Sequence, residues 1–155
     1  MIRLSKKVEY GLLALQFIAF RPEEKFSSKE IAEYYGISFE LLSKVLQQLQ
    51  KLQYITSVKG VHGGYILTKE PSQISVGDVI RDLSSEKKSL VECTDIHKNH
   101  ECYAFEKCTL KTPLQVIQRK INDAFNLFTI QDLVATDTSR NNNTVFISSD
   151  LVNII

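Results

Sequence analysis

The stretch from Ile37 to Lys69 constrains the fold more than any other part of the sequence. Its first half carries apolar residues at helical spacing, which predicts an amphipathic helix with one buried face: Leu41, Leu42, Val45, Leu46, Leu49 and Leu52. Two runs of β-branched and aromatic residues, 54–58 and 65–68, then flank the glycine-rich segment KGVHGG. Such runs around a glycine-rich segment are typical of a β-hairpin. The pattern predicts a long helix followed by a basic-tipped hairpin, although a core helix with an unrelated hairpin would look the same.

The opposite face of this helix carries side chains that can hydrogen-bond to base edges or phosphates: Ser43, Lys44, Gln47, Gln48 and Lys51. Ser38 is a suitable N-cap for it. Upstream, Ser27 and Glu30 form a capping-box pattern that opens another helix, and Gly36 is a residue suited to end it. A helix, a short glycine-containing turn and a second helix are typical of a helix-turn-helix. With the hairpin as a wing, the sequence predicts a winged helix-turn-helix.

Three further helices complete the predicted fold. An apolar helix should run from Ser5 to Phe20, and a short one, capped by Ser75, should reach Leu83. A long helix should begin at Thr112-Pro113, as N-cap and N1, and Thr129 should cap a final short turn. Its apolar stripe would be buried either by a second copy of the chain or by its own domain: Ile117, Ile121, Ala124, Phe125 and Phe128.

The predicted fold class is therefore mainly α with a small β-hairpin wing, namely a winged helix-turn-helix domain plus a long C-terminal dimerisation helix. Four segments follow from it. Residues 1–83 are the DNA-binding domain, 84–111 a cysteine-containing sensor loop, 112–134 the dimerisation helix and 135–155 a flexible tail.

The three cysteines, Cys93, Cys102 and Cys108, lie together in the polar segment between the winged domain and the long helix. Three thiolates in one segment suit a transition metal or an iron–sulfur cluster. Zinc, with His97 or His100 as a fourth ligand, is an alternative. A metal-free thiol switch is another, and it requires a lowered thiol pKa.

Charge and composition narrow the class of function. The net charge is only +1, but residues 1–70 hold 10 Lys and Arg against 7 Asp and Glu, as phosphate contact requires. A chain of 155 residues with 43% hydrophobic content can bury one sizeable core. It has no long apolar run and no signal-peptide pattern, so a cytoplasmic protein without a membrane partner is expected. No nucleophile–base constellation or nucleotide-binding glycine motif is present, so no enzymatic activity is expected.

Several motifs in order resemble the Rrf-two family of bacterial winged-helix regulators, which includes IscR-type, NsrR-type and CymR-type proteins. They are LSKKVEYGLLAL, SSKEIAEYYGIS, LLSKVLQQLQKL, VKGVHGGYIL and ISVGDVI, followed by the three cysteines, and they span residues 1 to about 134. The resemblance implies a homodimeric transcription factor that binds an operator in double-stranded DNA. In many members the three cysteines hold an iron–sulfur cluster.

The resemblance also implies individual roles. It places on the helix-turn-helix surface Ser28, Ser38, Phe39, Ser43, Lys44 and Gln48. Lys59 and Gly60 match the basic-glycine pair of the wing, which enters the minor groove, and His62 at the tip would contact DNA or solvent.

Two departures leave the fourth cluster ligand open. The IscR-type histidine after the third cysteine is missing, since Cys108 is followed by Thr-Leu-Lys, and the first two cysteines are further apart than is usual. In NsrR-type members an acid of the other subunit supplies the ligand, and Glu9 occupies that position. Glu9 is equally explained as an acid near a helix N-terminus, and His97 and His100 are local alternatives.

These observations predict a transcriptional repressor whose operator affinity depends on a [2Fe-2S] or [4Fe-4S] cluster. The cluster would sense redox state, nitric oxide or iron–sulfur status. A winged-helix regulator with a zinc-bound or metal-free thiol segment is the alternative, and a small cluster-carrying redox protein is a third.

Overall fold

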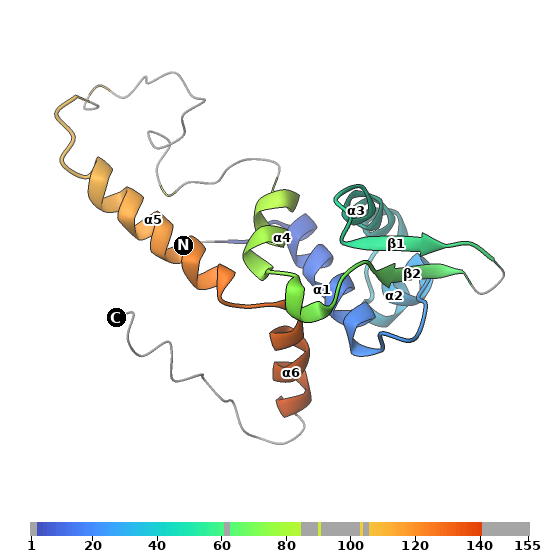
Figure 1. Ribbon diagram of the computed structural model, residues 1–155. Helices are drawn as coiled ribbons and strands as arrows, with labels where there is room; N and C mark the ends of the chain where they lie inside the picture. The colour runs from blue at the N-terminus through green and yellow to red at the C-terminus, as the bar shows by residue number, and fades with distance from the viewer. Residues whose placement is uncertain (1–2, 61–62, 85–89, 91–102, 104–105, 141–155) are drawn as a thin grey trace.

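The computed structural model of the 155-residue chain describes residues 3–60, 63–84, 90, 103 and 106–140, with side chains up to residue 136. Its elements in chain order are α1 (Lys6–Phe20), α2 (Ser28–Tyr35), α3 (Phe39–Lys51), β1 (Ile55–Val58), β2 (Gly64–Leu67), the 3-10 turn η1 (Pro71–Gln73), α4 (Val76–Leu83), α5 (Lys111–Asn126) and α6 (Ile130–Arg140). Helices α1 to α4 and the hairpin gather into one body, from which α5 projects on the side away from the hairpin (Figure 1).

Helix α1 lies at the centre of this body, in contact with α3, α4, α6 and β2. Its apolar sequence leaves several faces to bury, and Leu15 and Ile18 are almost completely covered. At Gly11, α4 passes so close to α1 that no side chain fits: a Cβ there would lie 2.2 Å from Cδ1 of Leu83. The predicted burial of this helix on several sides is confirmed.

The ends of α2 and α3 follow from local hydrogen bonds. Ser27 and Glu30 make the predicted capping box, with Ser27 N donating to Glu30 Oε2 at 2.7 Å. Gly36 ends α2 in the left-handed conformation, with a φ of 63°. At the end of α3 the same conformation falls on Gln53, with a φ of 61°. Tyr54 N then donates to Leu49 O at 3.0 Å, which closes the turn into β1.

The predicted wing is an antiparallel hairpin in which Ile55 pairs with Leu67 and Val58 with Gly64. Strand β2 is attached near its start to the loop between α1 and α2 through two backbone hydrogen bonds between Phe26 and Tyr65, of 2.8 and 3.3 Å. Since these bonds fix β2 against the body, the direction of the wing is determined by the body.

Residues 112–134, expected to form the dimerisation helix with a final short turn capped by Thr129, belong to two separate helices. α5 begins at Lys111, before the expected Thr112-Pro113 start, and Pro113 is tolerated in the first turn, where a backbone N–H has no helical partner. α5 ends at Asn126 because the next residues pair with the start of α4: Val76 N donates to Phe128 O and Ile130 N to Ile74 O, both at 2.9 Å.

Thr129 then caps α6 as predicted: its Oγ1 accepts a hydrogen bond from Asp132 N at 3.3 Å, and its backbone N–H donates to Asp132 Oδ2 at 2.7 Å. α6 continues to Arg140, so the expected flexible tail is wrong for residues 135–140, and residues 141–155 lie outside the described part. α6 packs against α1, where Gln16 Nε2 donates to Leu133 O at 2.8 Å, and Ile130 is completely buried. The body therefore includes α6, whereas α5 contacts the body at α4 and buries none of its residues.

Candidate DNA-binding surface and cysteine segment

Helix α3 turns one face to the core and the other to solvent. Its buried residues are Leu42, Val45, Leu46 and Leu49, four of the six predicted, and Leu52 is half-buried against the same core. The prediction is wrong for Leu41, which is 52% exposed. Leu41 lies at the edge of the buried stripe, about 100° around the helix from Leu42, where no element among the described residues covers it.

The exposed face of α3 carries most of the predicted polar residues. Its exposed residues are Phe39, Glu40, Leu41, Lys44, Gln47, Gln50 and Lys51. Ser38 precedes the helix as N-cap, yet its side chain makes no capping bond. Gln48 is half-buried. The prediction of an exposed hydroxyl is wrong for Ser43, whose Oγ is buried and unbonded within the described residues. Helical spacing places Ser43 at the boundary between the two faces, so periodicity could not assign it.

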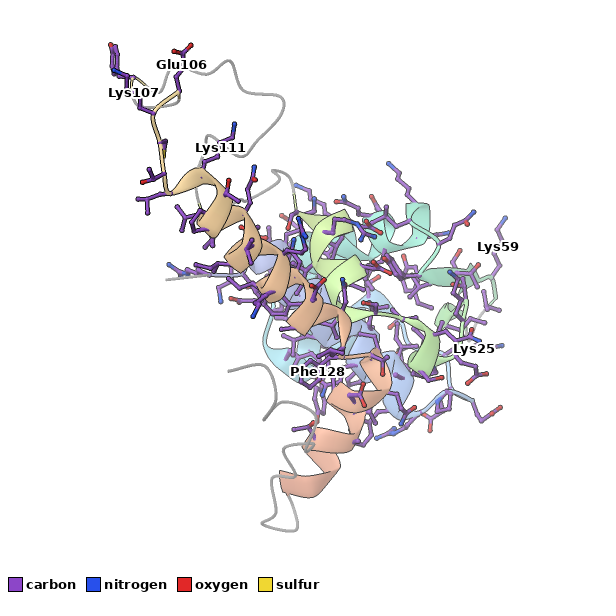
Figure 2. All side chains as sticks on the ribbon, turned by 60° about the vertical axis from the view of Figure 1, so that its left-hand side comes forward. Lys25, Lys59, Glu106, Lys107, Lys111 and Phe128 are labelled. Atoms are coloured by element: carbon purple, nitrogen blue, oxygen red, sulfur yellow. The ribbon has the colours of Figure 1, made fainter. Side chains whose placement is uncertain are left out.

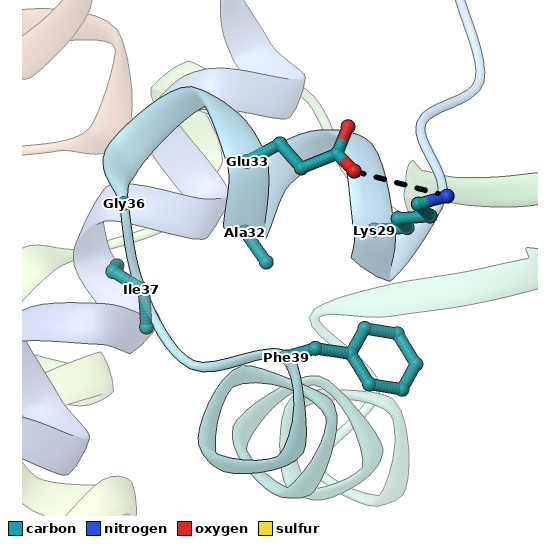
Figure 3. Close-up of a pocket in the computed structure, with 6 residues that line it drawn as sticks. All are labelled: Lys29, Ala32, Glu33, Gly36, Ile37 and Phe39. Atoms are coloured by element: carbon teal, nitrogen blue, oxygen red, sulfur yellow. Dashed lines mark ion pairs between the residues drawn. The ribbon is translucent and has the colours of Figure 1, made fainter.

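A shallow hollow separates the start of α3 from α2 (Figure 3). It has a volume of about 430 Å³ and is lined by Lys29, Ala32, Glu33, Gly36, Ile37 and Phe39. Lys29 and Glu33 form an ion pair of 3.8 Å on one rim, and the Phe39 ring, 54% exposed, stands on the other. Ser28, the first residue of α2, is half-buried.

The wing presents Lys59 directly after β1. Lys59 is exposed, and in Figure 2 it lies at the end of the molecule opposite Lys107 and Lys111. Gly60 has a φ of 132°, a conformation that side-chain-bearing residues rarely adopt, and Gly63 N donates to its carbonyl at 2.9 Å. His62 lies outside the described residues.

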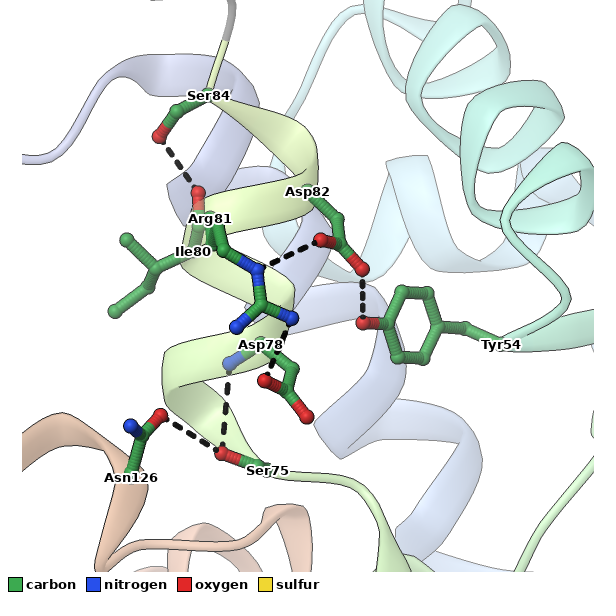
Figure 4. Close-up of polar contacts among 8 residues, drawn as sticks. All are labelled: Tyr54, Ser75, Asp78, Ile80, Arg81, Asp82, Ser84 and Asn126. Carbon is green, nitrogen blue, oxygen red and sulfur yellow. Dashed lines mark hydrogen bonds and ion pairs between the residues drawn. The ribbon is translucent and has the colours of Figure 1, made fainter. Parts of the chain in front are cut away.

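A polar network connects β1 to α4, beyond which the cysteine segment begins (Figure 4). Tyr54 lies just before β1, and its hydroxyl donates to Asp82 Oδ2 at 2.8 Å. Burial raises the pKa of Tyr54 well above its usual value, and the bond to the Asp82 carboxylate raises it further. Arg81 pairs with Asp78 at 2.7 Å and with Asp82 at 3.3 Å. The network therefore links the wing-bearing side of the body to α4.

The cysteine segment is described only in part. Cys108 is half-buried, and it precedes α5 by three residues. The other candidate ligands in the segment lie outside the described residues: Cys93, Cys102, His97 and His100. Among the described residues no group of three or more metal-ligating side chains gathers. By donor chemistry three thiols fit a transition metal or an iron–sulfur cluster, and Cys108 is accessible enough to act as one of them.

Glu9, the other candidate ligand, lies in the first turn of α1. It is half-buried and pairs with Lys6 at 2.5 Å. Glu9 is thus an ion-paired acid near a helix N-terminus in this structure, and a role as ligand requires it to leave Lys6.

A helix-turn-helix followed by a β-hairpin wing defines the class of winged helix-turn-helix proteins. A family model described as "Rrf2: Iron-dependent Transcriptional regulator" matches residues 4–136. The chain belongs to this family, the Rrf-two family that its motifs resemble, and it is a transcriptional regulator. The predicted fold class of a mainly α winged helix-turn-helix protein with a small β-hairpin wing is confirmed.

Known relatives agree with this assignment. The chain is 37% identical to an HTH-type transcriptional regulator NsrR of Geobacillus kaustophilus over 86% of this chain and 90% of that one. It is 34% identical to an NsrR of Shouchella clausii over 88% of this chain and 91% of the relative. The solved structure of T. potens IscR superposes with a TM-score of 0.70 at 27% identity over 94% of both chains. These relatives are transcriptional regulators and not enzymes.

None of the described helices is both long enough and apolar enough to span a bilayer.

Proposed function

We propose that this chain is a homodimeric, DNA-binding repressor whose operator affinity depends on an iron–sulfur cluster held by Cys93, Cys102 and Cys108. The family description as iron-dependent and the names of the NsrR and IscR relatives support the sensing part. The observation that carries the DNA-binding part is the exposed polar face of α3 beside an exposed wing lysine.

In this proposal α3 enters the major groove and the wing enters the adjacent minor groove. Ser38, Phe39, Lys44 and Gln47 contact DNA from α3, with Ser28 and Gln48 at the margin of the interface. Lys59, Gly60 and His62 contact DNA from the wing. Ser43 supports this surface from within, because its hydroxyl is covered.

Helix α5 is proposed to bind the same helix of a second copy. None of its residues is buried: Ile121, Ala124 and Phe125 of the apolar stripe are half-buried, and Ile117 of the stripe is 46% exposed. Helices with an incompletely covered apolar stripe are commonly buried in symmetric dimers. Two copies would hold two α3 helices at the spacing that a pseudo-palindromic operator requires.

Sensing and DNA binding are proposed to be coupled through α4. A thiolate-bound cluster supplies oxidation or loss as the sensed event. Residues 85–110 connect the end of α4 to the start of α5, and α4 contacts β1 through the Tyr54–Asp82 hydrogen bond. A change in this segment therefore acts on the α3 and wing unit through α4. A coupling of about 1–3 kcal/mol would change operator affinity roughly five- to a hundredfold.

DNA binding by the wing is tested with Lys59→Ala. Loss of this charge should weaken operator binding and reduce the salt-dependence slope by about one. Lys120→Ala, an exposed lysine on α5, removes the same charge elsewhere and is the matched control. Equal affinity and equal salt slope in Lys59→Ala and the wild type would contradict the wing assignment.

Cluster binding is tested by the ultraviolet–visible spectrum of protein purified without oxygen. Iron–sulfur charge-transfer bands should be present and should be lost in Cys93→Ala, Cys102→Ala and Cys108→Ala. Glu9→Ala should alter the spectrum if Glu9 is the fourth ligand, whereas an unchanged spectrum favours His97 or His100.

The second candidate is the same regulator with a zinc-bound or metal-free thiol segment. The missing histidine after Cys108 and the long spacing between the first two cysteines favour it. Colourless protein that holds stoichiometric zinc, or no metal, would support this candidate and contradict the cluster.

A further inference from the structure

Glu40 is an exposed acid on the face of α3 that the proposed function places in the major groove. One turn is about 3.6 residues, so Glu40, Lys44, Gln47 and Lys51 follow one line along the helix. This line lies opposite the buried Leu42, Val45, Leu46 and Leu49. A carboxylate in this place repels phosphates, so it weakens binding to DNA unless it meets a hydrogen-bond donor.

The Glu40 carboxylate has no partner within the described part of the protein. Lys44 follows it by four residues, a spacing at which Lys29 and Glu33 form an ion pair on α2. On α3 the corresponding pair is open: among the described residues no ion pair or side-chain hydrogen bond involves Glu40 or Lys44. Both side chains are therefore available to a ligand. A position in the first turn of a helix explains an acid there, but it does not explain why this acid lies in the middle of the exposed face.

The donors and acceptors of the major groove decide which base a carboxylate selects. Cytosine presents the N4 amino donor, whereas guanine and thymine present acceptors that repel a carboxylate. Adenine presents a donor beside the N7 acceptor, a pattern that suits an amide better than a carboxylate. Lys44, one turn further on, can donate to guanine O6 and N7.

From these observations we infer that Glu40 is a specificity-determining residue, which selects a cytosine in each operator half-site by accepting a hydrogen bond from its N4 amino group. The inference rests on the proposed function, because it needs α3 in the major groove. Glu40 contributes to discrimination between operator and other DNA, and it does not raise the affinity for DNA in general. At a site without the cytosine, its charge faces phosphates and acceptors, so binding is weaker than with a neutral residue.

The test begins with the full-length chain and a random pool of double-stranded DNA, from which bound sequences are enriched. The wild-type chain should enrich a half-site with one constant cytosine. Replacing that C·G pair by T·A places the O4 acceptor of thymine where cytosine had its N4 donor, and it should lower wild-type affinity roughly five- to a hundredfold. Glu40→Ala should be almost insensitive to the same base change and should bind unrelated DNA more tightly than the wild type does.

Glu40→Gln provides a second readout, since a glutamine amide matches the pattern of adenine. Enrichment with Glu40→Gln should replace the constant cytosine by adenine. Glu23→Gln removes a negative charge from an exposed residue of the loop between α1 and α2, outside α3 and the proposed dimer helix, and it should enrich the wild-type sequence. Unfolding midpoints equal to that of the wild type establish that the variants are folded.

The outcomes separate the two levels of the proposal. If the wild-type chain enriches no sequence, the proposed function fails, and the assignment of Glu40 fails with it. If the wild type enriches a sequence but Glu40→Gln enriches the same bases, or Glu40→Ala loses as much as the wild type on the C·G to T·A change, only the assignment of Glu40 is overturned.

Discussion

The winged body and helix α5 differ in how far they bury their apolar residues. In the body every helix buries apolar residues in a shared core, and even α6, which follows α5, contributes the fully buried Ile130. The 16 residues of α5 include none that is buried. An isolated helix of about this length is marginal in water. The body carries its own stability, and α5 depends on whatever covers it.

The largest expected difference between the two regions is the cost of removing one large apolar side chain. Leu46→Ala in the core of α3 should lower the free energy of unfolding by about 2–5 kcal/mol, because Leu46 is fully buried. Ile117→Ala on α5 should cost less than about 0.5 kcal/mol in dilute protein. Urea unfolding followed by tyrosine fluorescence measures both.

The dependence of the unfolding midpoints on protein concentration tests whether a second copy covers α5. If a second copy covers α5, the wild-type midpoint rises with concentration, and the Ile117→Ala midpoint rises less. Equal losses from Leu46→Ala and Ile117→Ala at every concentration would mean that α5 belongs to the same core.

Tyr54→Phe tests a contact inside the body, between the residue that precedes β1 and α4, the helix that α5 contacts. Loss of the bond to Asp82 should cost about 1–2 kcal/mol, as for a partly buried hydrogen bond to a charged acceptor. Because the folded state raises the pKa of Tyr54, the stabilisation is complete below about pH 10, where unfolded tyrosine ionises. It is lost as the pH rises further.

Tyr54→Phe should therefore be less sensitive to alkali than the wild type. Tyr103→Phe, which changes an exposed tyrosine outside the body, is the control and should leave the profile unchanged. An alkaline stability profile of Tyr54→Phe identical to that of the wild type would contradict the role of this hydrogen bond.

Within the body, Gly36 and Gln53 each take a left-handed backbone conformation after a helix. Opposite substitutions at these two positions should change stability in opposite directions, and by smaller amounts. Gln53→Gly should stabilise the protein by roughly 0.5 kcal/mol, because it relieves a positive φ in a side-chain-bearing residue. Gly36→Ala should destabilise it by about 1 kcal/mol, and only through the backbone, since a Cβ there meets no atom within 4 Å. Thermal unfolding measures both, and changes of the same sign at the two sites would contradict this explanation.

The smallest effect is expected at the start of α2. Hydrogen bonds from the Ser27 side chain and backbone lower the pKa of Glu30. Its stabilisation is therefore present above the ordinary glutamate pKa of about 4.5 and is lost as the pH falls through the lower value of the folded state. The wild type should lose a few tenths of a kcal/mol more than Glu30→Gln between pH 6 and 3, since the group is exposed. Parallel acid profiles would exclude this contribution.

The sequence predicted those parts of the fold that local signals control. Helices α1 to α4 and the hairpin were placed within about one residue by the expected start at Ser5, the caps at Ser27 and Ser75, and the apolar periodicity. The Thr129 cap signalled the start of α6, but the sequence could not show that α6 packs into the body, because this packing depends on backbone bonds to residues 74–76, about fifty positions earlier.

The candidate DNA-binding surface shows the same limit. Periodicity places a side chain by its angle around the helix, but exposure at the edge of a stripe depends on whether a neighbouring element reaches it. Leu41 and Ser43 lie at such edges, and both were assigned wrongly. Glu40 could have been found from the helical spacing, because it lies opposite the buried stripe.

The backbone bridge between residues 74–76 and 128–130 has a consequence for how such regulators can diversify. Both of its hydrogen bonds join main-chain atoms, so they do not depend on the side chains present. The chain returns to the same point beside α4 whatever lies between, and the entropy of closing a longer loop rises slowly with its length. Residues 85–126 can therefore be lengthened, shortened or exchanged in evolution, or grafted by design, while the elements around α3 keep their positions.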